Sequence, residues 1–217
     1  QKYKSKIACV VLEPSSTTCP KIDNKTSCCH KSRCDRNFKK KNNFLKRVQK
    51  LCKKNNIIFI LDEIITGFRS KNFSVQNQFK IKPDLTLIGK VSGGGLPIGI
   101  IGISGPALNR ISKLKKKIFF GGTFSGNAFS TFIGGEVIKF IKKKNLISKI
   151  IKKSTKFQKQ INSFLLKENI KVRVYRFDTI LRIIFTENKV VDRLQRDFLE
   201  TKKSNEIRNF KKYLFKK

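Results

Sequence analysis

The chain of 217 residues contains no methionine and no tryptophan, and only 14 of its side chains are acidic. A natural full-length translation product begins with methionine, so the absence of that residue even at position 1 predicts a fragment or a processed chain. Long apolar runs are missing too, since the stretch from Leu96 to Ser104 is far shorter than the roughly 20 residues of a membrane-spanning helix. No signal peptide is visible. We therefore predict no membrane association, and enough apolar residues remain for a core of good size.

Basic side chains greatly outnumber acidic ones, 50 against 14, which gives a formal net charge of +36. One interpretation is a protein that binds nucleic acid, because such a charge produces strong, salt-dependent attraction to polyanions. The other is drift in composition, because abundant lysine, isoleucine, asparagine and phenylalanine are what A/T-rich codons produce. The basic residues are spread along the whole chain and form no clustered stripe. The sequence therefore favours drift and predicts no specific nucleic-acid partner.

Four of the six cysteines lie with the only histidine in one polar stretch, at Cys19, Cys28, Cys29, His30 and Cys34. Thiolates and an imidazole can bind zinc. The spacing matches no standard zinc finger, however, and adjacent cysteines rarely bind one metal ion. We predict no metal site, while disulfides and sequence decay in this stretch remain the other interpretations.

The apolar pattern of the first 110 residues is typical of an α/β fold. Helical spacing from Phe44 to Lys54 leads into a buried-strand pattern at residues 57 to 61. A second strand is expected from Leu85 to Ile88, and the apolar stretch from Leu96 to Ser104 predicts another central strand. Alternating helices and strands of this kind favour a mostly parallel sheet.

The second half of the chain predicts one long helix followed by a smaller domain. Apolar residues from Phe132 onward indicate a helix that continues, increasingly basic, as far as Ile151. Strands are expected at residues 172–175 and 179–185, and the charged region from Lys189 predicts helical or frayed structure. We place the domain boundary at residue 150, with one domain at 1–150 and the beginning of a second at 151–217.

Charged side chains follow two of the predicted strands at their carboxyl ends. Asp62 and Glu63 follow the first, and Lys90 follows the second, after Gly89. Ligands of open α/β sheets bind at such ends, so a carboxylate and an amine could project into one crevice, where burial would disfavour the ammonium form. The alternatives are a strand-end turn for the acidic pair and one more surface position for Lys90.

Neither common nucleotide motif explains the Gly89-Lys90 pair. A P-loop requires glycine where Asp84 stands and serine or threonine where Val91 stands. The glycines at 93 to 95 do not continue into a dinucleotide fingerprint either.

Three blocks instead resemble the class III, pyridoxal-phosphate-dependent aminotransferases, and most of all the glutamate-1-semialdehyde aminomutases. They are Leu61-Asp-Glu-Ile-Ile-Thr-Gly-Phe-Arg69, Pro83-Asp-Leu-Thr-Leu-Ile-Gly-Lys-Val-Ser-Gly-Gly-Gly-Leu-Pro-Ile-Gly99 and Gly122-Thr-Phe-Ser-Gly-Asn127. The likeness is strong over residues 44 to 135 and weaker to about 190, and residues 15 to 40 depart from it. It implies a fold-type-I transferase: part of the large domain, with the start of an α+β C-terminal small domain and without the family's N-terminal half.

The resemblance also implies a role for each site residue. Lys90 would carry the Schiff base with pyridoxal 5'-phosphate and act as nucleophile and base. Asp62 would keep the pyridine nitrogen protonated, and Ile64 would pack against one face of the ring. Gly122 and Thr123 would bind the phosphate of the cofactor held by the neighbouring subunit, which implies a homodimer of the full-length parent.

The function implied is amino-group transfer from a small-molecule amino donor to a keto or aldehyde acceptor in the cytoplasm. The chain would act as an aminotransferase or as an aminomutase. Thr18 stands where many class III transaminases carry a glutamate, and this tilts the choice toward the aminomutases. Two alternatives stay open: a catalytically inactive fragment, and a basic nucleic-acid-binding protein that retains the fold.

Overall fold

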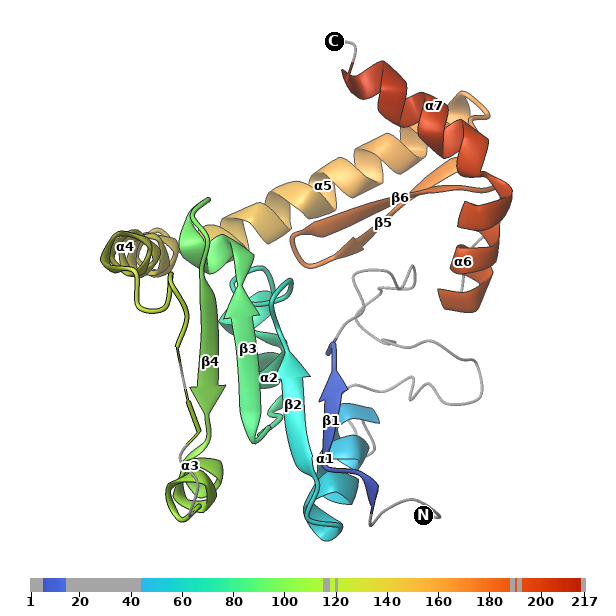
Figure 1. The fold of residues 1–217 in the computed structure, drawn as a ribbon. Helices are drawn as coiled ribbons and strands as arrows, with labels where there is room; N and C mark the ends of the chain where they lie inside the picture. Colours follow the sequence, from blue (N-terminus) through green and yellow to red (C-terminus); the bar gives the residue numbers. More distant parts are fainter. Residues whose placement is uncertain are drawn as a thin grey trace. The chain divides into compact units, whose positions relative to one another are not determined.

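The computed structural model describes residues 6–14, 44–114, 118–119, 121–187, 190 and 193–215. These residues form two compact units, each with its own sheet (Figure 1). Unit 1 contains the described residues up to Pro14 and from Leu45 to Ser148, and unit 2 contains Phe44 and those from Lys149 onward. The cysteine-rich stretch with His30, and with it the question of a metal site there, lies outside the described residues.

Unit 1 is built on a four-stranded sheet, in which β1 (Cys9–Leu12), β2 (Ile58–Asp62), β3 (Leu85–Gly89) and β4 (Gly99–Ile103) follow one another across the sheet. The first three strands are parallel, and β4 runs antiparallel to β3. Because β2 and β3 are parallel neighbours, their carboxyl ends meet at the same edge of the sheet (Figure 1).

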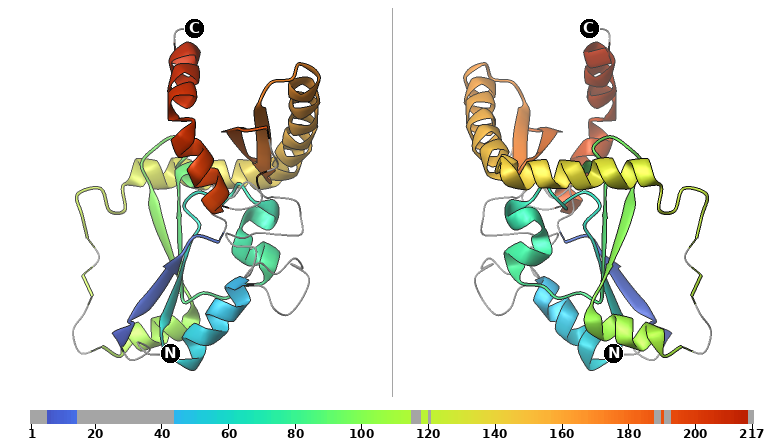
Figure 2. Two further views of the ribbon diagram at one scale, coloured as in Figure 1. Left: turned by 90° about the vertical axis from the view of Figure 1, so that its right-hand side faces the viewer. Right: turned by 90° about the vertical axis from the view of Figure 1, so that its left-hand side faces the viewer.

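Two helices, α1 (Phe44–Lys54) and α2 (Val75–Phe79), cover one face of this sheet (Figure 2). Helix α1 has the predicted bounds, although Leu51, expected on its apolar face, is 57% exposed. The core between helices and sheet is formed by Leu45, Cys52, Phe59, Leu61 and Val75. The sheet and the helices together hold the strand ends in place.

Four further elements complete the connections of unit 1: η2 (Lys71–Phe73), η3 (Lys90–Gly93), α3 (Gly105–Ser112) and α4 (Ala128–Lys143). Helix α4 begins after Asn127, whose side-chain oxygen accepts a hydrogen bond from the Ser130 N–H at 2.9 Å. Such a cap satisfies a backbone donor that has no partner within the helix. Helix α4 lies across the end of the sheet from which η3 starts (Figure 2).

Unit 2 consists of the hairpin β5 (Val172–Phe177) and β6 (Ile180–Phe185) with α5 (Leu146–Lys167), α6 (Arg193–Lys202) and α7 (Ser204–Phe215). Polar side chains of α5 contact the first strand directly. Asn162 both donates to the Val174 carbonyl and accepts from the Val174 N–H, each at 2.8 Å. These bonds fix the helix against the hairpin.

Two expectations about the elements are wrong. The long helix expected to run to Ile151 is broken after Lys143, because Asn145 adopts a left-handed backbone (φ 48°) that asparagine tolerates better than most residues. Strand β4, expected to be central, lies at the edge of the sheet among the described residues, and its Ile101 is 54% exposed. Apolar composition alone therefore overstated its burial.

Candidate active site

The ends of β2 and β3 bring the predicted carboxylate and amine to one edge of the sheet. Asp62 is the last residue of β2 and lies opposite Leu87 of β3, and Lys90 begins η3 directly after β3 ends. The ladder continues one residue further, because the Glu63 N–H donates to the Leu87 carbonyl at 2.8 Å. We call Asp62, Ile64 and Lys90 the strand-end cluster.

Asp62 and Ile64 are tied to each other through the backbone. The Oδ1 atom of Asp62 accepts a hydrogen bond from the Ile64 N–H at 3.0 Å, and both side chains are half-buried. A Cβ placed on Gly89 would lie 3.5 Å from Cγ2 of Ile64, so this side chain packs over the residue that precedes Lys90. Ile64 is thus bonded to Asp62 through its backbone and lies next to the residue that precedes Lys90.

Lys90 has an unusual backbone conformation and an exposed side chain. Its φ of 52° lies in the left-handed region, which costs a residue with a Cβ about 1–3 kcal/mol unless the surroundings hold it there. Backbone strain of this kind often occurs at functional sites. The side chain borders a depression of about 510 Å³ together with Arg69, Val91, Gly94, Gly95 and Leu96.

Helix α4 supports the segment that follows Lys90. A Cβ on Gly134 would lie 2.6 Å from the Ser92 carbonyl oxygen, and a Cβ on Gly94 would lie 2.6 Å from Cγ2 of Val137. No real side chain tolerates such distances, so the glycines allow the close approach of α4 to η3. Ser92 is fully buried by this contact. The segment from Lys90 to Gly94, which we call the lysine-bearing segment, is therefore held by β3, which directly precedes it, and by α4, which packs against it.

Glu63 differs from its neighbour Asp62 in burial and in the number of its hydrogen bonds. It is fully buried, and its carboxylate accepts hydrogen bonds from the Thr66 hydroxyl at 3.0 Å, the Val75 N–H at 2.7 Å and the Gln76 N–H at 2.8 Å. Burial raises the pKa of Glu63 above its ordinary value, although these three hydrogen bonds act in the opposite direction. Of the two acidic residues, Asp62 therefore lies at the edge of the sheet where β2 ends, and Glu63 lies inside the core.

Gly122 and Thr123 are not brought together with the strand-end cluster. Both are exposed, in the turn before α4 where the Ser125 N–H donates to the Gly122 carbonyl at 2.9 Å. Within the described part of the chain, neither residue makes a hydrogen bond to Asp62 or Lys90. Large aromatic side chains around them are also exposed, namely Phe119, Phe124, Phe129 and Phe132. We call these four residues the exposed phenylalanines.

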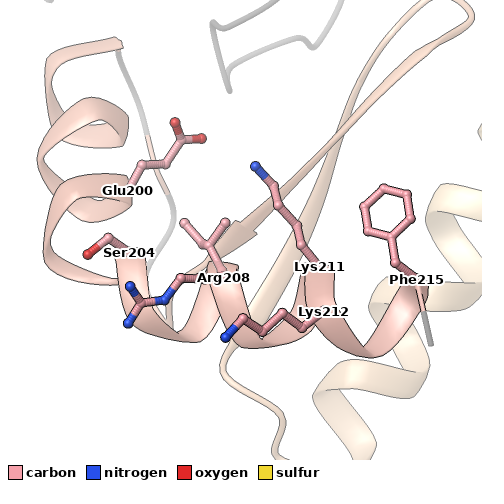
Figure 3. A pocket seen from close by; sticks show the side chains of 7 residues that line it. Glu200, Ser204, Arg208, Lys211, Lys212 and Phe215 are labelled. Atoms are coloured by element: carbon pink, nitrogen blue, oxygen red, sulfur yellow. The ribbon is translucent and has the colours of Figure 1, made fainter.

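A larger depression, of about 800 Å³, lies in unit 2 along α7 and the end of α6 (Figure 3). Basic side chains dominate its polar lining, with Arg208 on one turn of α7 and the adjacent Lys211 and Lys212 on the next. Its one acidic residue, Glu200, already receives two hydrogen bonds at 2.7 Å from the Arg182 guanidinium. The depression holds no residue of the strand-end cluster, and it offers neither a nucleophile beside a base nor a free carboxylate.

Metal-ligand clusters and membrane-spanning helices are both absent from the described residues. Among those residues, no group of three or more histidine, cysteine, aspartate or glutamate side chains could hold a metal ion. None of the described helices is long and apolar enough to cross a membrane.

Comparison with known proteins now identifies the family. The family model described as "Aminotransferase class-III" matches residues 37–205 of this chain. The chain belongs to the class-III aminotransferases. Both the resemblance and the fold class predicted from the three sequence blocks are thereby confirmed.

Named relatives of this class-III chain are glutamate-1-semialdehyde 2,1-aminomutases. That of Wigglesworthia glossinidia brevipalpis is 34% identical over 184 residues, covering 85% of this chain and 38% of the relative. That of Methanococcus maripaludis strain C5 is 32% identical over 216 residues, covering 98% of this chain and 44% of the relative. The chain thus spans less than half the length of these relatives.

Solved structures show the same fold. An omega-transaminase from Sphaerobacter thermophilus superimposes with a TM-score of 0.69 at 20% identity, over 90% of this chain and 41% of the other. A glutamate-1-semialdehyde aminomutase from Pseudomonas aeruginosa PAO1 gives 0.65 at 16% identity, over 88% of this chain and 40% of the other. At such identities the likeness concerns the fold alone.

Two residues near the cluster were missed as site residues. Arg69 ends the first sequence block, yet its place beside Lys90 in the depression depends on the turn from 63 to 70, which the sequence does not reveal. Glu63 could have been assigned to the core, because it follows the buried Phe59 and Leu61 at a spacing of two and therefore shares their face of the strand.

Proposed function

We propose that this chain supplies the lysine and the carboxylate of a pyridoxal 5'-phosphate site that transfers or relocates an amino group between small molecules. The main observation in support of this proposal is that Asp62 and Lys90 lie at the ends of paired parallel strands, within the region that matches the class-III family. In open α/β sheets this edge is where ligands bind.

The residues of the strand-end cluster have the chemistry that the cofactor requires. Lys90 offers an exposed primary amine, which can bond to an aldehyde carbon. Only Oδ1 of Asp62 is bonded to the Ile64 N–H, so Oδ2 can face a pyridine nitrogen. Ile64 presents an apolar side chain beside Gly89, suitable for packing on an aromatic ring. The donor set therefore fits pyridoxal phosphate.

Each residue would then have a defined role. Lys90 Nζ would hold the cofactor and, when free, would carry a proton to or from the substrate α-carbon. Asp62 would keep the pyridine nitrogen protonated, and Ile64 would pack against one face of the ring. When bound, the cofactor supplies an electron sink for the negative charge at the substrate carbon.

We further propose that the active protein is a homodimer in which Gly122 and Thr123 reach the cofactor phosphate of the partner subunit. The exposed phenylalanines support this arrangement, because Phe119 is 87% exposed and Phe124, one residue after Thr123, is 76% exposed. Four large aromatic side chains are thus exposed within residues 119–132, and exposed apolar surface of this kind often marks an interaction site. A second copy would cover them and would bring Gly122 and Thr123 to a site.

For the substrate, we propose a small amino compound handled in the manner of the aminomutase relatives. Support comes from the relatives of Wigglesworthia glossinidia brevipalpis and Methanococcus maripaludis strain C5 described above, both of which are named glutamate-1-semialdehyde 2,1-aminomutase. The cytoplasmic location and Thr18 as a substrate marker stay predictions, and Thr18 lies outside the described residues.

The proposal is tested by amino transfer in solution. The purified chain is mixed with pyridoxal phosphate and glutamate, and formation of the keto acid is followed by mass spectrometry against free cofactor. We expect the rate to fall to that of free cofactor in Lys90→Ala. The matched control Lys139→Ala, which removes an exposed lysine of the same unit paired with Glu136, should keep the rate. A rate of the unmodified chain equal to that of free cofactor would contradict the proposal for this chain.

A further inference from the structure

The two adjacent carboxylates at the end of β2, Asp62 and Glu63, lie on opposite faces of the strand. Successive side chains of a strand alternate in direction, so Glu63 points to the side of the buried Phe59 and Leu61, whereas Asp62 points away from them. A fully buried carboxylate without a basic partner is costly, and it persists only where several donors surround it. Among the described residues no lysine or arginine forms an ion pair with Glu63. The three hydrogen bonds that Glu63 accepts therefore indicate the structural role of its carboxylate.

All three donors to Glu63 belong to the segment that connects β2 to β3. The Val75 and Gln76 N–H groups lie in the first turn of α2, where backbone donors have no acceptor within the helix. The Thr66 hydroxyl lies in the turn that carries Ile64 at its start. One carboxylate thus holds the first turn of this connection and the start of α2 together at the end of β2.

The same connection reaches β3 through two contacts. The side-chain oxygen of Gln76 accepts a hydrogen bond from the Thr86 hydroxyl at 2.9 Å, and Thr86 is buried in β3. A Cβ on Gly67 would lie 3.3 Å from Cγ2 of Ile88, so the turn after Glu63 also packs on β3 two residues before Lys90. A continuous path of contacts therefore runs from Glu63 to the strand that carries the lysine.

We propose that Glu63 is a positioning residue, whose buried carboxylate fixes the turn with Ile64, helix α2 and strand β3 so that Asp62 and Lys90 keep their spacing. The proposal rests on the proposed function for its catalytic meaning, but the positioning itself is a property of the chain without cofactor. Removing the carboxylate should loosen the end of β3 while the rest of the sheet stays intact.

The test compares Glu63→Gln with two other variants by amide hydrogen exchange of the cofactor-free chain. In Glu63→Gln the side-chain volume is kept, but an NH2 group replaces one of the two carboxylate oxygens. This NH2 group cannot accept a hydrogen bond, so one of the two α2 backbone N–H groups loses its acceptor. Thr86→Val breaks only the link from Gln76 to β3. Glu136→Gln, which changes an exposed glutamate of α4 in the same unit, is the matched control.

We expect peptides covering residues 75–79 and 87–93 to exchange at least about fivefold faster in Glu63→Gln, with residues 105–112 of α3 unchanged. Thr86→Val should accelerate residues 87–93 alone, and Glu136→Gln neither segment. Acceleration spread equally over unit 1, or no change at 87–93, would overturn the proposal, because Glu63 would then serve stability in general or nothing beyond its own turn.

Cofactor binding provides the second readout. We expect the affinity of Lys90 for pyridoxal phosphate to fall about tenfold in Glu63→Gln, and an unchanged affinity would overturn the positioning role. If the unmodified chain shows no preference of the cofactor for Lys90, the proposed function fails, and the exchange data still decide whether Glu63 positions the end of β3.

Discussion

The strand-end cluster and the exposed phenylalanines belong to the same unit but differ in how their surroundings hold them. Asp62, Ile64 and Lys90 are fixed by the ladder between β2 and β3, by the Glu63 contacts and by α4. The phenylalanines lie on a surface, with Phe124 76% exposed and Phe132 67% exposed.

This difference indicates two kinds of functional residue. The geometry of residues that this chain holds by its own contacts is set by folding of the chain. Residues whose apolar neighbours face solvent acquire a defined environment only when another surface covers them. We therefore expect substitutions in the cluster to affect cofactor chemistry directly, and substitutions at the phenylalanines to affect association first.

The largest expected effect is that of Asp62→Asn on the proposed amino transfer. Asparagine keeps an oxygen for the Ile64 N–H but cannot hold a proton on the pyridine nitrogen. The rate should fall by at least about 100-fold, equivalent to about 2.7 kcal/mol of activation free energy. Keto acid formation measures the rate, and urea unfolding should show an unchanged free energy of unfolding. A loss of activity below tenfold would argue against contact with the ring nitrogen.

The next largest effect is expected on stability, when a methyl group is added at the contact between α4 and η3. In Gly134→Ala the new methyl group would meet the Ser92 carbonyl, whereas in Gly135→Ala nothing lies within 4 Å. Both changes gain the same helix propensity, so their difference isolates the contact. We expect Gly134→Ala to be less stable than Gly135→Ala by about 1–3 kcal/mol in urea unfolding. Equal stability would mean that α4 does not press on the lysine-bearing segment.

A smaller effect is expected at the exposed phenylalanines. Phe132→Ser should weaken self-association about tenfold, or about 1.4 kcal/mol, without lowering the free energy of unfolding of the monomer. Sedimentation velocity at several protein concentrations measures the association. Phe164→Ser, which removes a 52% exposed ring from unit 2, is the control and should leave association unchanged. If both variants weakened self-association equally, the association would be a nonspecific effect of exposed apolar surface.

The smallest expected effect concerns pH. Burial raises the folded-state pKa of Glu63 above its ordinary value of 4.5, so the folded state binds the proton more tightly than the unfolded state. The stability contributed by this group is fully present below the unfolded pKa and is lost as the pH rises through the folded pKa. Relative to Glu63→Gln, the unmodified chain should therefore lose stability as the pH rises from about 4.5 toward neutrality. Urea titrations at several pH values measure the free energy of unfolding of both chains. If the difference between the two chains does not change with pH, the raised pKa is contradicted.

Much of unit 1 was predictable because its signals are local. The apolar run from 57 to 61 and the spacing from Phe44 to Lys54 predicted β2 and α1 to within one residue. The position of Lys90 after β3 followed from the glycine that ends the strand. Its left-handed backbone did not follow, because lysine has no local preference for that conformation.

Contacts between segments explain the other misses. Helix α4 ends at Lys143 because Asn145 adopts a left-handed turn, while the apolar pattern continues across the break. The edge position of β4 depends on strand order, which hydropathy does not encode. Glu63 was paired with Asp62 as one acidic motif, although the alternation of β2 places the two carboxylates on opposite faces.

The most direct test of the central claim is to find which lysine binds the cofactor. The purified chain is incubated with pyridoxal phosphate, reduced with borohydride and mapped by mass spectrometry, with Lys90→Ala as control because so basic a chain reacts nonspecifically. The strand-end cluster predicts preferential modification at Lys90 and loss of the specific visible absorbance in Lys90→Ala. Modification scattered over the lysines, with none favoured at position 90, would contradict the account of a cluster that this chain holds by itself.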